Sequence, residues 1–356
     1  MPARIDIDLS AVARNARALA DRARTRLIPM VKADAYGMGV RAVVQALEKV
    51  DPWGFGVATV SEGEELRALG VELPVITFTP LLESELAAAS AARLTPALGS
   101  AATIRAWQSL GGPWHLAIDT GMARAGASWR DVASLREVVL ASPPEGAFTH
   151  FHSAELDDGS MQEQDRRFED ALTALGLAAV FTHTDNSAAV LRRGRSSRDA
   201  VRPGIFLYGG ATVPGAAIEP DPVAHLRAPI VDLRACEAGD TISYGATFKA
   251  THRMRIATLA CGYADGYPRN VGQQGRPGAT VVLRGRRVPI VGRVTMDMIM
   301  IDVTGVECAA GDTVTLIGGE GGELVTVAEV GASAGITPYE VLVGMNSRSP
   351  RVPHED

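Results

Sequence analysis

Residues 26–50 read RLIPMVKADAYGMGVRAVVQALEKV and decide how the first part of the chain folds. The opening segment is short, apolar and strand-like, and it ends at Lys32. A turn with glycines follows, and then an apolar–polar pattern typical of an amphipathic helix. The stretch therefore predicts a strand–turn–helix unit with a lysine at the end of the strand. In α/β barrels such strand ends carry the chemistry.

The same alternation of strand-like and helix-like segments recurs over residues 1–225. The strand-like stretches are 26-RLIPMVKA, 53-WGFGVAT, 74-PVITFT, 93-RLTPAL, 115-HLAIDT, 146-GAFTHF, 179-AVFTHT and 204-GIFLYG. Helix-like segments lie between them, and Ser61 and Ser128 are predicted N-caps. This alternation indicates βαβ units and a parallel sheet. Eight strands favour a closed (β/α)8 TIM-like barrel over a Rossmann sheet, since no GxGxxG motif follows the first strand.

The pattern changes near Pro220. Residues 226–356 read as alternating strands with tight turns, for example 279-ATVVLRGRRVPIVG and 309-AAGDTVTLIGG. Asp and Gly at the turns favour short antiparallel connections. The predicted fold class is therefore α/β, with a barrel followed by a mostly-β C-terminal domain.

The composition excludes several classes of function. The chain has 356 residues, enough for two cores, and 35 basic against 41 acidic residues, which disfavours nucleic acid as a partner. The start, MPARIDIDLS, lacks the apolar stretch of a signal peptide, and no apolar run approaches the roughly 20 residues that span a membrane. Three cysteines without CxxC spacing suit a reducing compartment and predict no metal site. We therefore expect a cytoplasmic protein without membrane or nucleic-acid partners.

Polar residues follow the ends of the predicted barrel strands, and a barrel brings those ends to one mouth. They are Lys32, Tyr36, Asp119, Thr120, Arg124, His150, His183 to Ser187, and Arg202 to Tyr208. Taken singly, each has an ordinary structural explanation, such as an ion pair for Lys32 or a core position for His150. Their convergence on one rim favours a functional site.

Two features of this rim point to a cofactor. The amides of Gly204 and Ile205, together with Ser187, lie near predicted helix starts and suit a phosphate group. A desolvated lysine opposite them, at position 32, is a nucleophilic amine. The combination indicates pyridoxal phosphate (PLP) attached to Lys32.

Motifs over nearly the whole chain resemble those of the alanine racemase family. In order, they are IDIDLSAVARNAR, VKADAYGMG, IDTGMARAG, FTHFHSAE, DNSAA, VRPGIFLYG, SYGATF, CGYADGYPRN and GRVTMDM. The resemblance implies racemisation of L-alanine to D-alanine, PLP in the barrel, and a head-to-tail homodimer. In that dimer the β domain of each subunit completes the site of the other. The biological role would be supply of D-alanine for the cell wall or catabolism of L-alanine.

The resemblance also implies the role of individual residues. Lys32 would hold PLP and act as one acid/base, and Tyr244 of the second subunit would act as the other, because racemisation moves a proton between opposite faces of Cα. His150 and Arg202 would support the tyrosine, and Arg202 would face the ring nitrogen of PLP. The remaining roles are phosphate binding by Tyr36, Ser187, Gly204 and Ile205, cofactor and substrate contact by Arg124, substrate carboxylate contact by Met296, and an access channel lined by Glu155, Tyr263, Arg269 and Arg293.

Three positions depart from the family pattern. Ala117 stands where many members carry a carbamylated lysine that orients the arginine, so Arg124 needs another anchor, such as chloride or water. Met38 replaces the usual histidine of the lysine motif. Ser347 stands where a tyrosine often binds phosphate and guards the channel, so a wider access channel is expected.

These departures leave alternatives open. One is racemisation of serine or of a broader set of small amino acids. Another is a PLP-dependent amino-acid decarboxylase of related fold, although that resemblance lacks the SYGATF and GYADGYPR motifs in this order. A third is a non-catalytic PLP carrier, which is disfavoured because such carriers are single barrels without a β domain.

Overall fold

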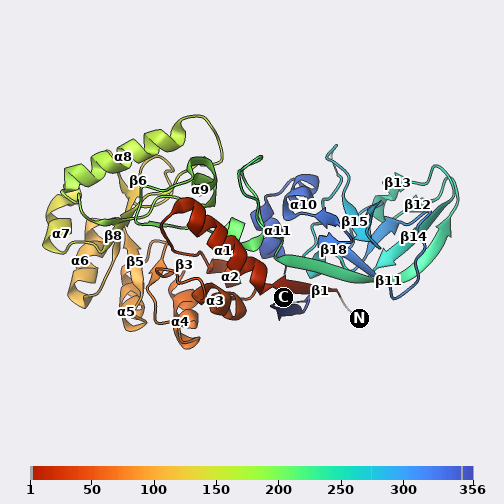
Figure 1. Cartoon of the computed structure of the whole chain (residues 1–356), viewed down its shortest axis with the longest axis horizontal. Coiled ribbons are helices and arrows are strands. Elements are labelled where there is room, and N and C mark those ends of the chain that lie inside the picture. The colour runs from red at the N-terminus through yellow and green to blue at the C-terminus, as the bar shows by residue number, and fades with distance from the viewer. Residues whose placement is uncertain (1–2, 274, 346–347, 356) are drawn as a thin grey trace.

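A computed structural model of the chain describes residues 3–273, 275–345 and 348–355. Figure 1 shows two bodies side by side, one ringed by helices and one rich in strands. The helix-ringed body comes from the N-terminal part of the chain and the strand-rich body mostly from the C-terminal part.

The first body is a closed barrel of parallel strands. Its strands are β2 (Arg26–Leu27), β3 (Phe55–Val57), β4 (Val75–Thr77), β5 (Thr95–Leu98), β6 (His115–Asp119), β8 (Gly146–Phe148), β9 (Phe181–Thr182) and β10 (Ala200–Val201). Strands β3 to β9 pair in sequence order, and β10 pairs with β2. Bridges from Met30 to Gly56 and from Asn186 to Arg202 join β2 to β3 and β9 to β10. The predicted barrel is therefore confirmed.

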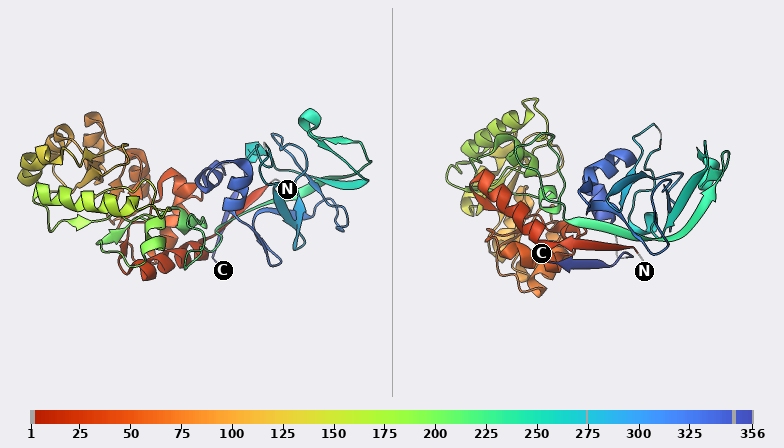
Figure 2. Two further views of the ribbon diagram at one scale, coloured as in Figure 1. Left: turned by 90° about the horizontal axis from the view of Figure 1, so that it is seen from above. Right: turned by 45° about the vertical axis from the view of Figure 1, so that its right-hand side comes forward.

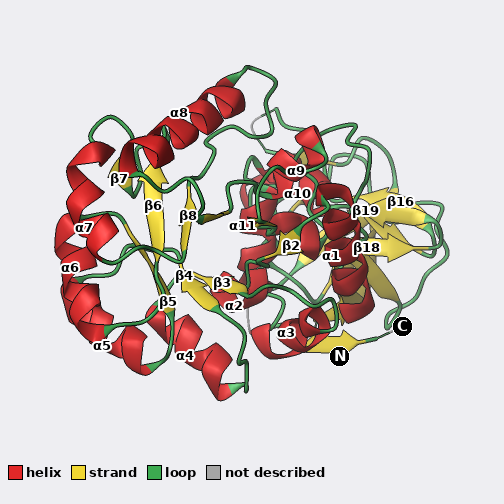
Figure 3. Cartoon of the chain, turned by 60° about the vertical axis from the view of Figure 1, so that its left-hand side comes forward, coloured by secondary structure: helices red, strands yellow, loops and turns green. Residues whose placement is uncertain are grey.

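Helices cover the outside of this barrel, as Figure 3 shows. They are α1 (Leu9–Ala23), α3 (Val40–Glu48), α4 (Val60–Ala68), α5 (Glu83–Ala91), α6 (Ala101–Leu110), α7 (Arg136–Ala141), α8 (Ser160–Leu175) and α9 (Ser187–Arg193). The N-cap of α4 is Thr59, which forms a capping box with Glu62, so the predicted cap at Ser61 is wrong. Ser128 lies in β7 (Ala127–Ser128) and caps no helix. Within the described ranges, no helix combines the length and the apolar character needed to cross a bilayer.

The predicted eighth strand at residues 204–209 is also wrong. The strand is β10, and the apolar run after it forms a short 3-10 helix, η2 (Ile205–Tyr208). All four side chains of η2 are buried, so the run has no polar alternation that would distinguish a strand from a short helix. The helix ends at Gly209, whose φ of 83° lies in the left-handed region.

The second body contains a nine-stranded sheet. Its strands are β1 (Arg4–Asp8), β11 (Ala224–Cys236), β14 (Met254–Leu259), β15 (Thr280–Leu283), β16 (Arg286–Pro289), β17 (Ile299–Asp302), β18 (Thr313–Glu320), β19 (Glu323–Val325) and β20 (Arg351–His354). A separate hairpin joins β12 (Thr241–Ile242) to β13 (Phe248–Lys249). Pairings are antiparallel except between β1 and β20. The predicted mostly-β character is confirmed.

Two helices of this body have no counterpart in the sequence prediction. They are α10 (Val327–Ala334) and α11 (Pro338–Gly344), and each begins with a Thr/Glu capping box. The cap of α11 is Thr337 with Glu340, and a proline follows the cap at the first helical position. These are clear start signals. Helix α11 contacts the short turn that follows Lys32.

The first strand crosses the predicted division of the chain at residue 225. Strand β1 lies in the sheet of the second body, antiparallel to β11 and parallel to β20. Figure 2 shows it between these two strands. Ile5 and Ile7 are fully buried there, so apolar burial stabilises the strand in this sheet.

Candidate active site

The mouth of the barrel opens into a cavity of about 830 Å3. Its lining includes the predicted cofactor residues Lys32, Tyr36, Arg124, His150, Ser187, Arg202, Gly204 and Ile205. They come from the segments that follow β2, β6, β8, β9 and β10. The barrel thus gathers at one mouth residues that are far apart in the sequence.

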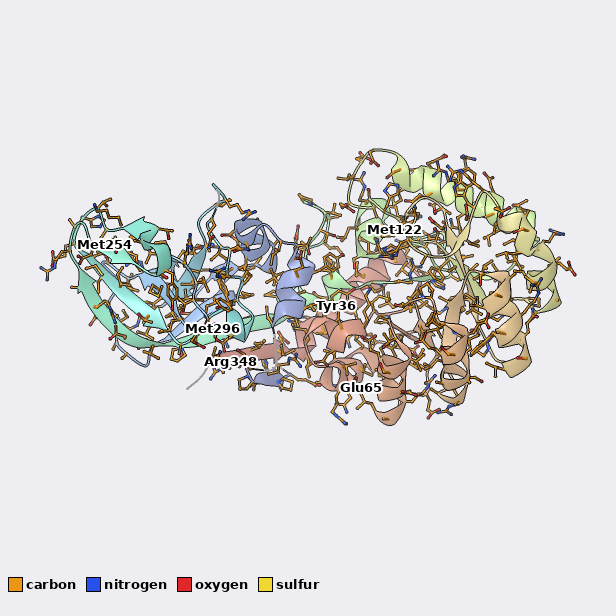
Figure 4. The ribbon with its side chains drawn as sticks, turned by 180° about the vertical axis from the view of Figure 1, so that it is seen from behind. Tyr36, Glu65, Met122, Met254, Met296 and Arg348 are labelled. Atoms are coloured by element: carbon orange, nitrogen blue, oxygen red, sulfur yellow. The ribbon has the colours of Figure 1, made fainter. Side chains whose placement is uncertain are left out.

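The other predicted site residues lie outside this cavity. They are Tyr244, Met296, Glu155, Tyr263, Arg269 and Arg293. Tyr244 is 71% exposed and Met296 is 53% exposed. In Figure 4, Met296 lies on the strand-rich body, away from Tyr36 and Met122 of the cavity. One chain alone does not bring Tyr244 to Lys32.

Several of these outlying residues are neighbours of one another. The Ser243 hydroxyl donates to the carbonyl of Arg293 at 2.7 Å, and the amide of Ala264 donates to the carbonyl of Met296 at 3.0 Å. The guanidinium of Arg269 lies 5.9 Å from the centre of the Tyr263 ring. The second body therefore presents its own cluster of predicted site residues.

Lys32 is a partly buried amine among positive charges. Burial lowers its pKa, and the charges of Arg124 and Arg202 lower it further, whereas Glu62 opposes the shift. A lowered pKa raises the fraction of free amine at neutral pH. Lys32 is thus suited to act as a nucleophile and as a base.

The four residues after Lys32 form a left-handed turn. Ala33, Asp34, Ala35 and Tyr36 have φ between 53° and 56°. For L-residues a left-handed helical conformation costs roughly 1–2 kcal/mol each, so the turn needs ties to its surroundings. Ala33 donates its amide to Glu62 Oε1 at 2.8 Å, and one carboxylate oxygen of Asp34 accepts the amide of Val40 at 2.7 Å.

The turn places the hydroxyl of Tyr36 against the backbone of Gly204. A Cβ at Gly204 would lie 2.3 Å from the Tyr36 hydroxyl oxygen, so only glycine fits there. The Gly204 amide donates to the Ser187 hydroxyl at 3.0 Å. Burial raises the pKa of Tyr36, so its phenol stays protonated and able to donate. Two hydroxyls and a glycine backbone thus form a cradle that fits a phosphate group.

Arg202 is buried at the base of the cavity. Its Nη1 lies 2.9 Å from His183 Nδ1, and its Nη2 donates to the carbonyl of Thr149 at 2.8 Å and lies 3.4 Å from His150 Nδ1. Burial, with help from Arg124, lowers the pKa of Arg202 to about 9, so it remains charged at neutral pH. Burial and the charge of Arg202 lower the pKa of His150 to about 3, which keeps that imidazole neutral.

A histidine that sequence reasoning missed extends this arrangement. His115 Nδ1 lies 2.7 Å from His183 Nε2 in the barrel core. Because an arginine can only donate, His183 accepts at Nδ1 and donates from Nε2 to His115. The sequence does contain a signal for this pair. His115 begins one predicted barrel strand, and His183 lies at the end of another.

Tyr339 of α11 is a second residue that sequence reasoning missed. It lines the cavity from the second body of the same chain, and its ring centre lies 6.1 Å from that of Tyr36. Tyr36 also stacks on Tyr208, with ring centres 4.7 Å apart. Tyr339 could not be placed from the sequence because α11 itself was not predicted.

The three positions that depart from the family pattern fall in different places. Ala117 lines the cavity, and its methyl group offers no site for a carbamate. Met38 is buried in the core and is not among the lining residues. Ser347 lies outside the described residues.

The fold and the site define a two-domain α/β-barrel protein with a partly buried lysine and a cradle of hydroxyl and backbone groups at the barrel mouth. The family model "Alanine racemase, N-terminal domain" matches residues 7–212, and "Alanine racemase, C-terminal domain" matches residues 223–353. The chain belongs to the alanine racemase family.

Individual relatives match over almost the full length. An alanine racemase of Nostoc sp. is 35% identical, covering 98% of this chain and 95% of that protein. One of Deinococcus radiodurans is 37% identical, covering 97% of each. The crystal structure of alanine racemase from Bartonella henselae, described with covalently bound pyridoxal phosphate, superimposes with a TM-score of 0.90 at 27% identity, covering 99% of this chain and 100% of that one.

Proposed function

We propose that this protein interconverts L- and D-alanine, using PLP attached to Lys32 in the barrel mouth. The observation that carries the proposal is the partly buried Lys32, whose pKa is lowered, in the same cavity as a cradle that fits a phosphate. Membership of the alanine racemase family supports the reaction, and the Bartonella henselae structure supports the cofactor.

Each residue at the mouth has a proposed task. Tyr36 and Ser187 would donate to the phosphate alongside the backbone of Gly204 and Ile205. Arg124 would contact the cofactor's phenolic oxygen and the substrate. When bound, PLP withdraws electron density from the α-carbon of the amino acid and so makes its hydrogen acidic.

Arg202 has a distinct proposed task, at the ring nitrogen. A guanidinium that stays charged would donate a hydrogen bond there and keep its own proton. Arg202 would thus supply no proton to the nitrogen, which would limit electron withdrawal and disfavour side reactions such as transamination. His150, neutral and close to Arg202, would accept from it and help to orient it.

The second base is proposed to come from another copy of the chain. Racemisation requires removal of a proton on one face and return of a proton on the other. Lys32 would serve one face, and the partner subunit's Tyr244 the other. The exposure of Tyr244 and Met296, both outside the cavity, supports a homodimer in which the strand-rich body of one copy covers the barrel mouth of the other. Glu155, Tyr263, Arg269 and Arg293 would then line the access channel.

Chiral chromatography of the products tests this proposal. The purified protein with PLP should convert L-alanine to a mixture of L- and D-alanine, and parallel incubations with L-serine and other small amino acids define the substrate range. Failure to racemise any of them would overturn the proposal.

The chain has three lysines, Lys32, Lys49 and Lys249, so the attachment site can be identified without ambiguity. Borohydride treatment should fix PLP on the peptide that contains Lys32. Lys32→Ala should abolish both labelling and turnover, whereas Lys249→Ala should leave both unchanged. Labelling of another lysine would show that Lys32 has a different role.

A further inference from the structure

We propose that the strand-rich body of the same chain clamps the left-handed turn 33–36 through Arg351, and that this clamp positions Tyr36 for the cofactor's phosphate. The inference rests on the proposed function, because it concerns the phosphate end of the same site. It makes Arg351 a positioning residue, although Arg351 does not line the cavity.

Two side-chain hydrogen bonds tie the turn to the helices of the barrel body. Glu62 accepts the amide of Ala33, and Asp34 Oδ1 accepts the amide of Val40. Both lie on the side of α3 and α4. They leave the second carboxylate oxygen of Asp34 free to bind a group from the other body.

Arg351 on β20 supplies that group. Its Nη1 donates to Asp34 Oδ2 at 2.5 Å, and the side chains are 26% and 44% exposed, so the pair is partly shielded from water. Strand β20 is fixed in turn by its pairing with β1. The ion pair thus connects the turn to a strand whose position is set by a nine-stranded sheet.

A second contact from the same body meets the end of the turn. Gly37 has a φ of 85°, and a Cβ there would lie 2.6 Å from the carbonyl oxygen of Leu342 in α11. Backbone therefore packs directly on backbone. The same helix presents Tyr339 to the ring of Tyr36. Arg351 and α11 together hold the turn from the side opposite the barrel.

The backbone next to the lysine has a tie to the barrel that does not involve the second body. The amide of Val31, just before Lys32, donates to the carbonyl of Gly56 at 2.9 Å, which ties the lysine backbone to β3. The turn is joined to the same segment by the amide of Ala35, which donates to the carbonyl of Val31 at 2.9 Å, and Tyr36 stacks on Tyr208. Arg351 and α11 hold the other side of the turn. Loosening the clamp should therefore disturb phosphate binding more than the attachment of the aldehyde to Lys32.

Pyridoxal has the aldehyde but lacks the phosphate. Its binding therefore distinguishes an effect on phosphate binding from an effect on attachment to Lys32. We would prepare the protein free of cofactor and measure by absorbance the dissociation constants of PLP and of pyridoxal. Arg351→Met should weaken PLP binding about fivefold and leave pyridoxal binding unchanged. Arg351→Lys should restore part of the loss, because it keeps the positive charge.

Two further variants guard against a simple folding defect. Asp34→Asn keeps the acceptor for Val40 and removes the charge, so it should match Arg351→Met, and the double variant should be no weaker than either single variant. Lys49→Met is the matched control. Its ion pair with Glu355, at 2.5 Å, also joins the C-terminal segment to the barrel but does not touch the turn, so PLP binding should not change.

The outcomes separate the two proposals. If the unaltered protein fails to bind PLP, the proposed function fails and the clamp with it. If it binds PLP, but Arg351→Met binds PLP as tightly as before, only the clamp is overturned. Equal weakening of PLP and pyridoxal also overturns it, because that pattern indicates general loosening of the barrel mouth.

Discussion

The barrel mouth and the exposed cluster around Tyr244 differ in how complete they are. At the mouth, one chain supplies a cavity with a lysine, a phosphate cradle and a buried arginine. Around Tyr244, predicted site residues lie together on an open surface with no cavity residue among them. The first region is an enclosed site, whereas the second is an exposed surface, which we propose to meet the mouth of another copy.

Subunit mixing is the test of this difference with the largest expected effect. Lys32→Ala and Tyr244→Phe chains should each be inactive alone. In a mixed dimer with shared sites, one site has both groups and the other has neither. Random mixing makes about half of the dimers mixed, so activity should return from none to about a quarter of the unaltered value.

The control for this experiment is proof that subunits exchanged, for example by native mass spectrometry of chains that carry different tags. If mixed dimers form and no activity returns, Tyr244 and Lys32 of one chain serve the same site, and the two regions are not complementary halves.

Exchange of α-hydrogens in heavy water tests whether Tyr244 moves a proton. If Tyr244 serves the L face and Lys32 the D face, Tyr244→Phe should still exchange the α-hydrogen of D-alanine. Exchange from L-alanine should fall by at least about a hundredfold, which is typical of removing an acid/base group. Proton NMR measures both rates.

Equal loss of exchange from both enantiomers would assign Tyr244 a different task, namely positioning the substrate. The mouth would then contain both bases or use one base for both faces. Phenylalanine keeps the ring of the tyrosine, so this variant removes the hydroxyl alone.

The smallest expected effect concerns the left-handed turn at the mouth. Ala33 is exposed and has a φ of 54°, so glycine at this position loses little packing and removes the left-handed penalty. Ala33→Gly should raise the midpoint of thermal unfolding by about 1 °C. The matched control, Ala42→Gly within α3, should lower it, because glycine in a helix interior costs about 1 kcal/mol. A decrease in both variants would show that the turn is not strained.

The sequence predicted those parts of the molecule that depend on local pattern. The strand–helix alternation was enough for the barrel, and the rule that strand ends converge was enough to bring Lys32, His150 and Arg202 together. The eighth strand was misplaced because the buried run 205–208 reads as apolar in any conformation. Helix α11 was not predicted although Thr337 and Glu340 form a capping box, because the strand-like pattern of the surrounding region outweighs so short a helix signal.

Long-range pairings were beyond sequence reasoning. Nothing local in residues 4–8 indicates that β1 pairs with β11 and β20, because the alternation of a strand fixes its faces and not its partners. For the same reason the ion pair of Asp34 with Arg351 could not be predicted. The role of Tyr339 depends on both, since it reaches the cavity only when the two bodies are packed together.

The position of β1 has a consequence for how the protein is made. A ribosome releases Arg4–Asp8 early, yet both of its partner strands are synthesised later, and β20 follows every other strand of the sheet. At about 5–20 residues per second, the strand waits on the order of tens of seconds with its hydrogen-bonding edges open. An unpaired, partly apolar strand of this kind is a template for pairing with other nascent chains. The barrel helices can form during that interval, but the nine-stranded sheet is complete only after β20 has been synthesised.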